Sequence, residues 1–278
     1  MLIQANAKIN LALNVIGKRD DGYHELDMIM IPLQLHDDIE ISLAKEDKFT
    51  SDDKTVAMDT SNTVVKAVNL MRDTFQLKDH FHIQLHKRIP SQAGLAGGSA
   101  DGAAVLRGIW KLCNIDISIE ELAQLGKKIG ADVPFCVLNQ CCIVQGIGDR
   151  LIPFSLDWKP HVLLVKPNVG VSTKEAYETL DYTACAHPDV AHIKQLLETK
   201  QFSEVYQHIG NSLENSAFKL APEIKMIKEE LIEMGFTCVL MSGSGSCVFA
   251  ISEDEQFVKK AVQYYQNRNV FVCNTSFL

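Results

Sequence analysis

Apolar and polar residues alternate along the start of the chain, and this period of two predicts a β-strand over residues 2–15. Ile9 and Leu11 lie on one face of that strand, and Lys8 and Asn10 lie on the other. A turn signal, Lys-Arg-Asp-Asp-Gly, follows at residues 18–22. The pattern then predicts two more strands within residues 28–43, separated by a break at the polar run His36-Asp37-Asp38.

The next hundred residues predict helices between short strands. Polar residues 45–61 predict a loop or an edge strand, and residues 62–75 have the apolar spacing of a helix. Residues 82–86 alternate like a strand, and a helix-like run follows from Ala103 to Leu112. Ser118 and Glu121 form a capping box that begins a helix extending to about residue 129. Residues 141–153 predict a hairpin with its turn at 146–149.

The remaining chain alternates strands and helices in a β-α-β style, and Trp158-Lys159-Pro160 marks a boundary before it. We therefore predict an α+β protein with one domain at residues 1–153 and a second at 154–278. The predicted strands of the second domain cover 161–165, 237–241, 247–251 and 269–274. Its predicted helices cover 173–180, 188–198, 201–209, 222–234 and 253–266.

Composition narrows the class of protein. The 278 residues are 46% apolar and 22% charged, as in an ordinary globular protein. A net charge of −8 without a basic cluster disfavours nucleic acid as a partner. No apolar run approaches the ~20 residues of a membrane span, and the N-terminus lacks the blocks of a signal peptide. The eight cysteines are scattered without a CxxC pair, so we expect a cytoplasmic protein with reduced thiols.

A glycine-rich loop at residues 90–100 joins a predicted strand to a predicted helix. Small residues at such a junction let backbone N–H groups approach an anion, and the helix directs its positive end to the same place. The loop therefore predicts a phosphate site. It is not a Walker A loop, since no Lys-Ser or Lys-Thr pair closes it, and its glycine spacing is not that of the dinucleotide fingerprint. The alternative is a glycine-rich turn without a ligand.

Three ordered motifs resemble those of the GHMP kinases, the family of galactokinase, homoserine kinase and mevalonate kinase. They are Ala7-Lys8-Ile9-Asn10-Leu11, the loop Pro-x-x-x-Gly-Leu-x-Gly-Gly-Ser at 90–99, and Ser242-Gly243-Ser244-Gly245-Ser246. The resemblance implies a two-domain fold, with an N-terminal domain like the second domain of ribosomal protein S5 and a ferredoxin-like C-terminal domain. It also implies direct transfer of the γ-phosphoryl group of ATP, with Mg²⁺, to an alcohol.

The resemblance assigns catalytic roles to Lys8 and Asp132, which would have to converge on the reacting hydroxyl. Asp132 would accept its proton, and Lys8 would steady the developing negative charge. From the residues alone, Asp132 is equally a turn residue before Val133-Pro134, and Lys8 is a solvated lysine on a half-buried strand.

The resemblance places the phosphates of ATP on the backbone of the loop, with the Ser99 hydroxyl directed to phosphate or Mg²⁺. The loop residues in question are Pro90, Ser91, Gln92, Ala93, Gly94, Leu95, Ala96, Gly97, Gly98, Ser99 and Ala100. Asn62 and Lys87 stand where the family suggests adenine contacts. The alternatives are a helix N-cap for Asn62 and an ordinary strand-end charge for Lys87.

Two further motifs, Gly22-Tyr23-His24-Glu25-Leu26 and Gly130-Ala131-Asp132-Val133-Pro134-Phe135, point to a member whose substrate carries a cytidine diphosphate group. Tyr23 and His24 would stack on the base and read its edge, with Tyr177 as a second aromatic. Asn10 would bind the alcohol part of the substrate. The resemblance also implies substrate contacts from Gly243, Ser244 and Gly245.

Some features leave alternatives open. Relatives often have glycine at 96 and serine at 100, and we expect the methyl group of Ala96 to require a backbone angle outside the glycine region. A metal site at His80, His82 and His86 is disfavoured, because no carboxylate or cysteine accompanies them at matching positions. A kinase for another small alcohol and a non-catalytic nucleotide-binding protein remain as rival functions. The pattern does not decide between monomer and homodimer.

Overall fold

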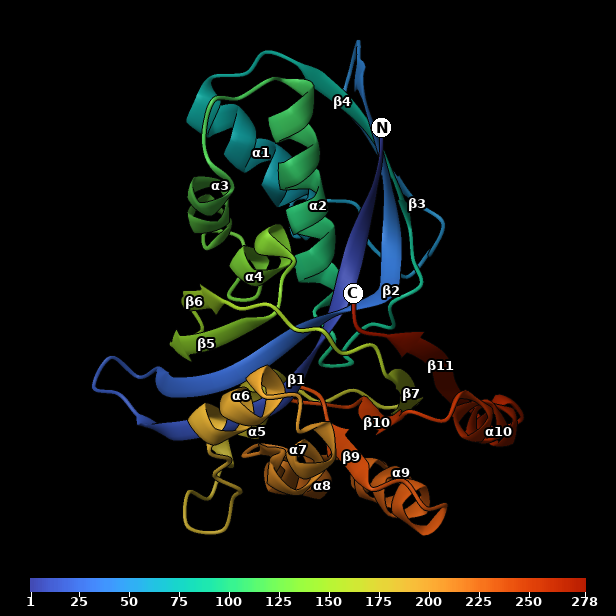
Figure 1. The fold of residues 1–278 in the computed structure, drawn as a ribbon. Coiled ribbons are helices and arrows are strands. Elements are labelled where there is room, and N and C mark those ends of the chain that lie inside the picture. Colours follow the sequence, from blue (N-terminus) through green and yellow to red (C-terminus); the bar gives the residue numbers. More distant parts are fainter. The chain divides into compact units, whose positions relative to one another are not determined.

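The computed structural model describes residues 1–278 and divides into two compact units (Figure 1). The first unit comprises residues 1–7, 35–89 and 96–140, and the second comprises 8–34, 90–95 and 141–278. Strands β1 (Leu2–Lys18) and β2 (His24–Ala44) belong to both, because each continues from one unit into the other. The boundary near residue 153, inferred from the sequence, stays a prediction.

The first unit is a sheet covered by helices on one face. Its strand order is β3 (Lys48–Ser51), β4 (His80–His86), β2 and β1, with β4 antiparallel to β2 and parallel to β3. Phe81, Ile83 and Leu85 alternate along β4 and are fully buried. Figure 1 shows the helices of this unit to one side of these strands. Their bounds are α1 Thr63–Phe75, α2 Gly97–Leu112, α3 Ile119–Gly126 and α4 Val133–Leu138.

Strand β2 is continuous through His36-Asp37-Asp38, so the predicted break is wrong. The carboxylate of Asp37 is fully buried, and it accepts hydrogen bonds from the backbone N–H groups of Arg88 and Ile89. A buried polar side chain that is satisfied in this way does not interrupt a strand. Polarity alone was therefore a poor guide to the end of this strand.

The second unit contains the remaining strands. Strand β5 (Cys142–Gly146) pairs with β2 and with β6 (Arg150–Pro153), which confirms the predicted hairpin, and β8 (Gly210–Asn211) pairs in parallel with β1. A separate antiparallel sheet has the order β11-β7-β10-β9. Its strands are β7 His161–Pro167, β9 Cys238–Met241, β10 Val248–Ser252 and β11 Val270–Ser276.

In the second unit, α9 and α10 pack against the antiparallel sheet, whereas α6 packs against α7, and α8 against α5 and α9. Their bounds are α5 Thr173–Glu178, α6 Val190–Glu198, α7 Phe202–His208, α8 Glu214–Leu220, α9 Pro222–Glu233 and α10 Glu255–Gln266. The sequence did not predict α4, α8 or β8, which are all shorter than the window in which periodicity can be recognised. Helix α2 also begins six residues before the predicted Ala103.

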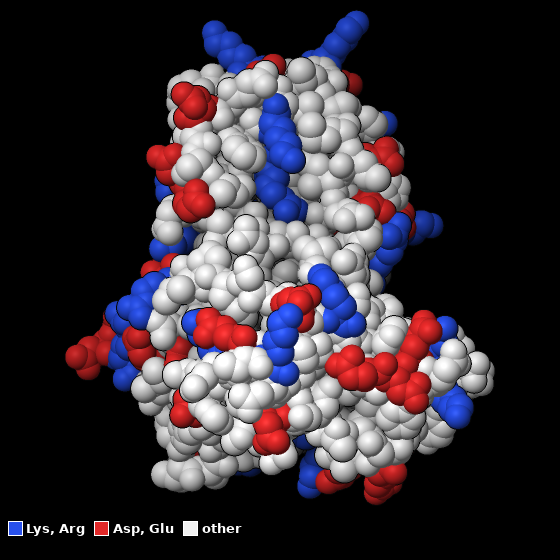
Figure 2. All heavy atoms as spheres, in the orientation of Figure 1, with Lys and Arg blue, Asp and Glu red and all other residues white.

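Basic and acidic side chains are intermixed on the face of the molecule drawn in Figure 2, and several Lys and Arg side chains have Asp or Glu side chains beside them. Many ion pairs are local, such as Lys194 with Glu198 and Lys259 with Glu255. No helix is both long enough and apolar enough to span a membrane.

Candidate active site

The first turn of α2 forms the part of the glycine loop that lies in the first unit. Its N-cap, Ala96, makes no side-chain hydrogen bond, and its first turn contains no acidic residue. The first N–H groups of a helix have no partner within the helix, and the helix dipole makes this end positive. The backbone of Gly97, Gly98 and Ser99 therefore has N–H groups that could bind an anion, and the phosphate site inferred from the loop stays a prediction.

Ala96 adopts a left-handed conformation with φ 57° and ψ 27°. The expectation that its methyl group requires a backbone angle outside the glycine region is wrong. The chain keeps the conformation that glycine favours and accepts the steric cost of a Cβ atom there, about 1–2 kcal/mol. We therefore expect the loop to keep the same path with glycine at residue 96.

The part of the loop that lies in the second unit is joined to the glycine-rich motif of the C-terminal sheet. The carbonyl oxygens of Gln92 and Ala93 accept hydrogen bonds from the N–H groups of Ser246 (3.3 Å) and Cys247 (3.1 Å). The Ser242 hydroxyl donates to the Gly94 carbonyl at 2.9 Å. Two motifs separated by about 150 residues are thus held together through their backbones.

Lys8 lies at this junction, and its side chain is buried. Its ammonium group donates to Asn10 Oδ1 at 2.7 Å, and its backbone N–H donates to the Leu95 carbonyl at 3.1 Å. A Cβ atom added to Gly243 would lie 3.3 Å from Lys8 Nζ and 3.1 Å from the Gly94 carbonyl oxygen. The second unit therefore brings together Lys8, Asn10, Gly94 and Gly243, which the sequence had assigned to one site.

Asp132 stands in the first unit, beside the start of α2. It precedes α4 and is half-buried, and its side chain makes no capping hydrogen bond to that helix. A Cβ atom at Gly130, two residues earlier, would lie 4.0 Å from Ser99 Oγ. The Gly130-Ala131-Asp132 motif is thus adjacent to the glycine loop. Since Lys8 and Asp132 belong to different units, their convergence stays a prediction.

Asn62 is the N-cap of α1, with its side chain accepting a hydrogen bond from the Val64 N–H at 2.9 Å. The next residue, Thr63, donates its hydroxyl proton to the Gly98 carbonyl at 2.5 Å. The side-chain amide of Asn62 also donates to the Ala57 carbonyl. The start of α1 therefore lies beside the loop, and the adenine contact of Asn62 stays a prediction.

Lys87 has buried carboxylates as partners. Its ammonium group lies 2.5 Å from Asp37 Oδ2 and 2.9 Å from Asp101 Oδ2, and its side chain is 9% exposed. The two carboxylates raise the pKa of Lys87, although burial opposes them. The predicted adenine contact of Lys87 stays untested, and its partners were not predicted.

Aromatic rings gather around His24 in the second unit. The ring of Tyr177 lies 4.7 Å from that of His24 between centroids, and the ring of Tyr182 lies 6.4 Å away. Burial, together with the charge of Lys18, lowers the pKa of His24. Tyr23 is exposed. The contact of His24 with Tyr177 brings two of the predicted residues together, and their role toward a base stays a prediction. Tyr182 was not singled out from the sequence.

Asn211 was also missed. Its buried side-chain amide donates to the carbonyl oxygens of Met241 and Gly243, both at 2.8 Å, and its Oδ1 accepts from the Leu213 N–H. It therefore adds side-chain hydrogen bonds to the backbone at the start of the 242–246 turn. A lone asparagine after a helix carries no sequence signal for this role.

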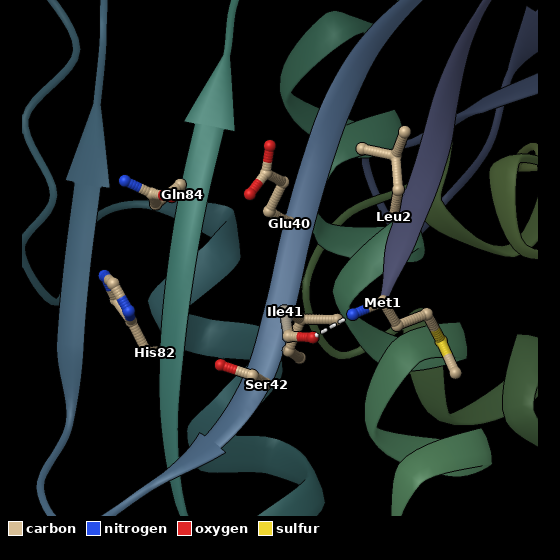
Figure 3. A pocket seen from close by; sticks show the side chains of 7 residues that line it. All are labelled: Met1, Leu2, Glu40, Ile41, Ser42, His82 and Gln84. Atoms are coloured by element: carbon tan, nitrogen blue, oxygen red, sulfur yellow. Dashed lines mark hydrogen bonds between the residues drawn. The ribbon is translucent and has the colours of Figure 1, made fainter.

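The structure contains no group of three or more His, Cys, Asp or Glu side chains able to hold a metal ion. The histidines of β4 have separate partners, His80 with Asp47 and His86 with Asp52. His82 lies in a shallow pocket on the sheet face opposite the helices (Figure 3). The residues lining that pocket are Met1, Leu2, Glu40, Ile41, Ser42, His82 and Gln84.

Comparison with known proteins identifies the class. Residues 62–140 match the model of the GHMP kinases N terminal domain, and residues 184–270 match the GHMP kinases C terminal model. The chain belongs to the GHMP kinase family, which confirms the family and the fold class predicted from its motifs. Homoserine kinase from Cytophaga hutchinsonii has the same fold, with a TM-score of 0.72 at 17% identity, over all of this chain and 94% of that one.

Within the family, the chain is similar to particular kinases. It is 40% identical over 262 residues to 4-diphosphocytidyl-2-C-methyl-D-erythritol kinase of Geobacillus sp. (strain WCH70), covering 94% of this chain and 91% of that one. Its identity to the kinase of the same name from Bacillus subtilis (strain 168) is 41%, with the same coverage. A crystal structure of 4-(cytidine 5'-diphospho)-2C-methyl-D-erythritol kinase superposes with a TM-score of 0.84 at 29% identity, over all of both chains.

Proposed function

We propose that the protein transfers the γ-phosphoryl group of ATP to the 2-hydroxyl of 4-diphosphocytidyl-2-C-methyl-D-erythritol, giving the 2-phosphate and ADP in non-mevalonate isoprenoid biosynthesis. The observation that carries the proposal is the buried ammonium group of Lys8 beside Gly94 and Gly243. The names of relatives about 40% identical over 94% of the chain support the choice of substrate. The eight free cysteines support a cytoplasmic setting.

The chemistry needs positioning and charge neutralisation more than a reactive side chain. The hydroxyl oxygen forms a bond to the γ-phosphorus while the bond to the β,γ-bridging oxygen breaks, and ADP leaves with the electron pair. Asp132 accepts the hydroxyl proton. Lys8, whose ammonium group Asn10 orients, offsets the negative charge on the transferring group.

Mg²⁺ enters with ATP as part of the substrate. Mg²⁺ commonly keeps several waters and takes phosphate oxygens with only one or two protein ligands. The absence of a cage of carboxylates is compatible with that mode. We assign the Ser99 hydroxyl, at the start of α2, to the phosphates or their metal ion.

The cytosine base is held by the aromatic group around His24. Tyr23 is exposed and available for stacking, and the ring of Tyr177 lies beside that of His24. Because burial favours the neutral imidazole, His24 keeps one nitrogen able to accept and one able to donate toward the edge of the base.

Incubation of the purified protein with the proposed substrate and Mg·ATP tests the function directly, with ADP release as the readout. We expect Asp132→Asn to lower kcat by about 10²–10⁴-fold, the usual contribution of a general base, while nucleotide affinity changes only a few-fold. Asp116→Asn, at an exposed aspartate of the same unit, is the control and should leave kcat unchanged.

Two outcomes would contradict the proposal. The first is ADP release no faster with the cytidine substrate than without it. The second is a larger thermal shift with mevalonate than with CDP, which would favour a kinase for another alcohol. Full activity of Asp132→Asn would instead remove that residue from its role while leaving the substrate assignment intact.

A further inference from the structure

A buried network of three charged side chains connects the two ends of the glycine loop. Lys87, just before the loop, reaches Asp37 of β2 at 2.5 Å and Asp101 of α2 at 2.9 Å. Both aspartates are buried, and all three residues belong to the first unit. None was predicted to act in this way, and neither carboxylate has a place in the chemistry proposed above.

The two oxygens of Asp37 have separate tasks. Oδ1 accepts hydrogen bonds from the backbone N–H groups of Arg88 at 2.5 Å and Ile89 at 2.8 Å, and Oδ2 accepts from Lys87. The carboxylate therefore fixes the last residues of the chain before Pro90. Backbone N–H groups held by a buried carboxylate lose most of their freedom to move.

Asp101 performs the corresponding task after the loop. It lies in the second turn of α2, and through Lys87 it ties that helix to the chain entering the loop. The two segments approach closely, since a Cβ atom at Gly97 would lie 3.0 Å from Ile89 Cγ2 and 3.5 Å from Lys87 Nζ. Residues 87–89 and the start of α2 are thus held as one body.

The network holds more acidic groups than basic ones. Two carboxylates surround one ammonium group, and Asp101 Oδ1 is buried without a hydrogen-bond partner. Buried ion pairs often stabilise a protein less than apolar residues of the same volume would, and an unpaired buried oxygen adds a further cost. Stability is therefore a poor explanation for the network, whereas a geometric role agrees with what it connects.

We propose that Asp37 and Asp101 are positioning residues for nucleotide binding, which act through Lys87 to hold the strand end and the start of α2 in the geometry that receives the phosphates of ATP. The inference rests on the proposed use of ATP as phosphoryl donor. It assigns the buried ammonium group to the support of the loop, in place of direct contact with the base.

Two substitutions test it without leaving the lysine unpaired. Asp101→Leu removes the acceptor, keeps the number and branching of the side-chain heavy atoms, and leaves a Lys87–Asp37 pair of opposite charges. Asp37→Asn can keep the bonds to Arg88 and Ile89 on its remaining oxygen but places an amide N–H₂ against Lys87. Asp101→Asn retains an oxygen that can accept from Lys87 and serves as the conservative rescue.

The control lies at a similar arrangement away from the loop. Asp47 accepts hydrogen bonds from Arg72 and from the Phe81 N–H in the same unit. Asp47→Leu therefore removes a partly exposed carboxylate that also holds a backbone N–H group, without touching residues 87–101. A merely structural role for Asp101 predicts that both leucine variants change Tm and neither changes nucleotide affinity.

The measurements are calorimetric titration of each variant with a non-hydrolysable Mg·ATP analogue, Tm, and the split between KM for ATP and kcat. We expect Asp101→Leu and Asp37→Asn to raise Kd and KM about tenfold, with kcat within threefold, because misplaced donors weaken phosphate binding. Asp101→Asn and Asp47→Leu should stay within twofold of wild type. Circular dichroism checks folding. If Asp101→Leu does not fold, the nucleotide affinity of Asp37→Asn tests the inference.

Wild-type affinity in both Asp101→Leu and Asp37→Asn would overturn the inference, as would an equal loss in Asp47→Leu. The test also separates this inference from the function on which it rests. A wild-type protein that binds the nucleotide but does not phosphorylate the cytidine substrate contradicts the proposed function alone. A wild-type protein that phosphorylates it, with variants that bind normally, contradicts the positioning role alone.

Discussion

The two parts of the glycine loop are held by different kinds of interaction. In the first unit, buried charges on Lys87, Asp37 and Asp101 fix the chain on either side of the loop. In the second unit, residues 92–94 are held by main-chain hydrogen bonds and close packing against residues 242–247. The glycine loop therefore depends on charged side chains where the chain enters and leaves it, and on hydrogen bonds to its backbone at residues 92–94.

This difference predicts which changes each part tolerates. A part held by charges responds to pH and to isosteric replacement of a carboxylate, since both alter the charge without altering the shape. A part held by the backbone is indifferent to pH but cannot accept an added Cβ atom where two main chains meet. The predictions below separate the two kinds of support.

The largest effect is expected at Gly94. Its φ is 72°, and an added Cβ atom would lie 2.9 Å from the carbonyl carbon of Ser242 and closer still to its oxygen. Neither main chain can move aside without breaking its bonds to the other. We expect Gly94→Ala to destabilise the protein by about 3 kcal/mol or more, from backbone strain and overpacking together, and to abolish turnover, as measured by Tm and ADP release.

Gly148→Ala provides the control for Gly94→Ala. Gly148 also has a positive φ, 95°, but an added Cβ atom would meet nothing within 4 Å. Gly148→Ala should lower the free energy of unfolding by only about 1 kcal/mol, from backbone strain alone. Equal losses in the two variants would show that the approach to Ser242 does not constrain the loop.

The network of Lys87, Asp37 and Asp101 should make the stability of the protein depend on pH. Burial raises the pKa of Asp101 to about 7, with Lys87 opposing the shift and Asp37 adding to it. The folded state therefore binds a proton that the unfolded state has lost between about pH 4 and pH 7, so stability falls as pH rises through that window. Between pH 4 and pH 8, we expect the free energy of unfolding of Asp101→Asn to rise relative to that of wild type by on the order of 2–3 kcal/mol.

Asp47 gives the opposite sign and so serves as the control for the pH experiment. Burial alone would raise the pKa of Asp47, but the Phe81 N–H and Arg72 hold that pKa below its usual value. The stability that Asp47 contributes is present above its unfolded pKa and is lost as pH falls. The free energy of unfolding of Asp47→Asn should therefore fall relative to that of wild type as pH rises. Tm measured from about pH 2 to pH 8 checks both signs, because the Asp47 effect develops below about pH 4 and the Asp101 effect above it. Parallel curves for Asp101→Asn and wild type would contradict the first.

A smaller effect is expected where a side chain supports the backbone-held part. Asn211→Ala leaves the carbonyl oxygens of Met241 and Gly243 without the amide donor, at a cost of about 1–3 kcal/mol. We expect KM to rise more than kcat falls, because the 242–246 turn loses a support and no reacting group. Asn215→Ala removes one exposed bond to Ala184 and should be nearly silent in Tm. Equal effects of the two variants would remove Asn211 from this role.

The sequence predicted the parts of the fold and of the site that carry local signals. The glycine loop, the capping box at Ser118 and the hairpin at 141–153 each depend on residues close together in the chain. Asp37 was taken for the end of a strand because its partners, Arg88 and Ile89, lie some fifty residues away. Asn211 and Tyr182 were missed for the same reason, since their contacts form only when distant segments meet.

The smallest predicted effect concerns Ala96, between the two kinds of support. Its methyl group occupies a left-handed conformation, which costs about 1–2 kcal/mol, whereas glycine adds roughly 0.5–1 kcal/mol of entropy to the unfolded chain. Ala96→Gly should therefore stabilise the protein by about 1 kcal/mol or less and leave KM for ATP within twofold, as measured by Tm and steady-state kinetics. Ala93→Gly, at a buried loop position without a positive φ, should destabilise instead. If Ala96→Gly weakened nucleotide binding severalfold, the methyl group would be fixing the loop, and the path of the chain at residue 96 would not be set by its two flanking supports.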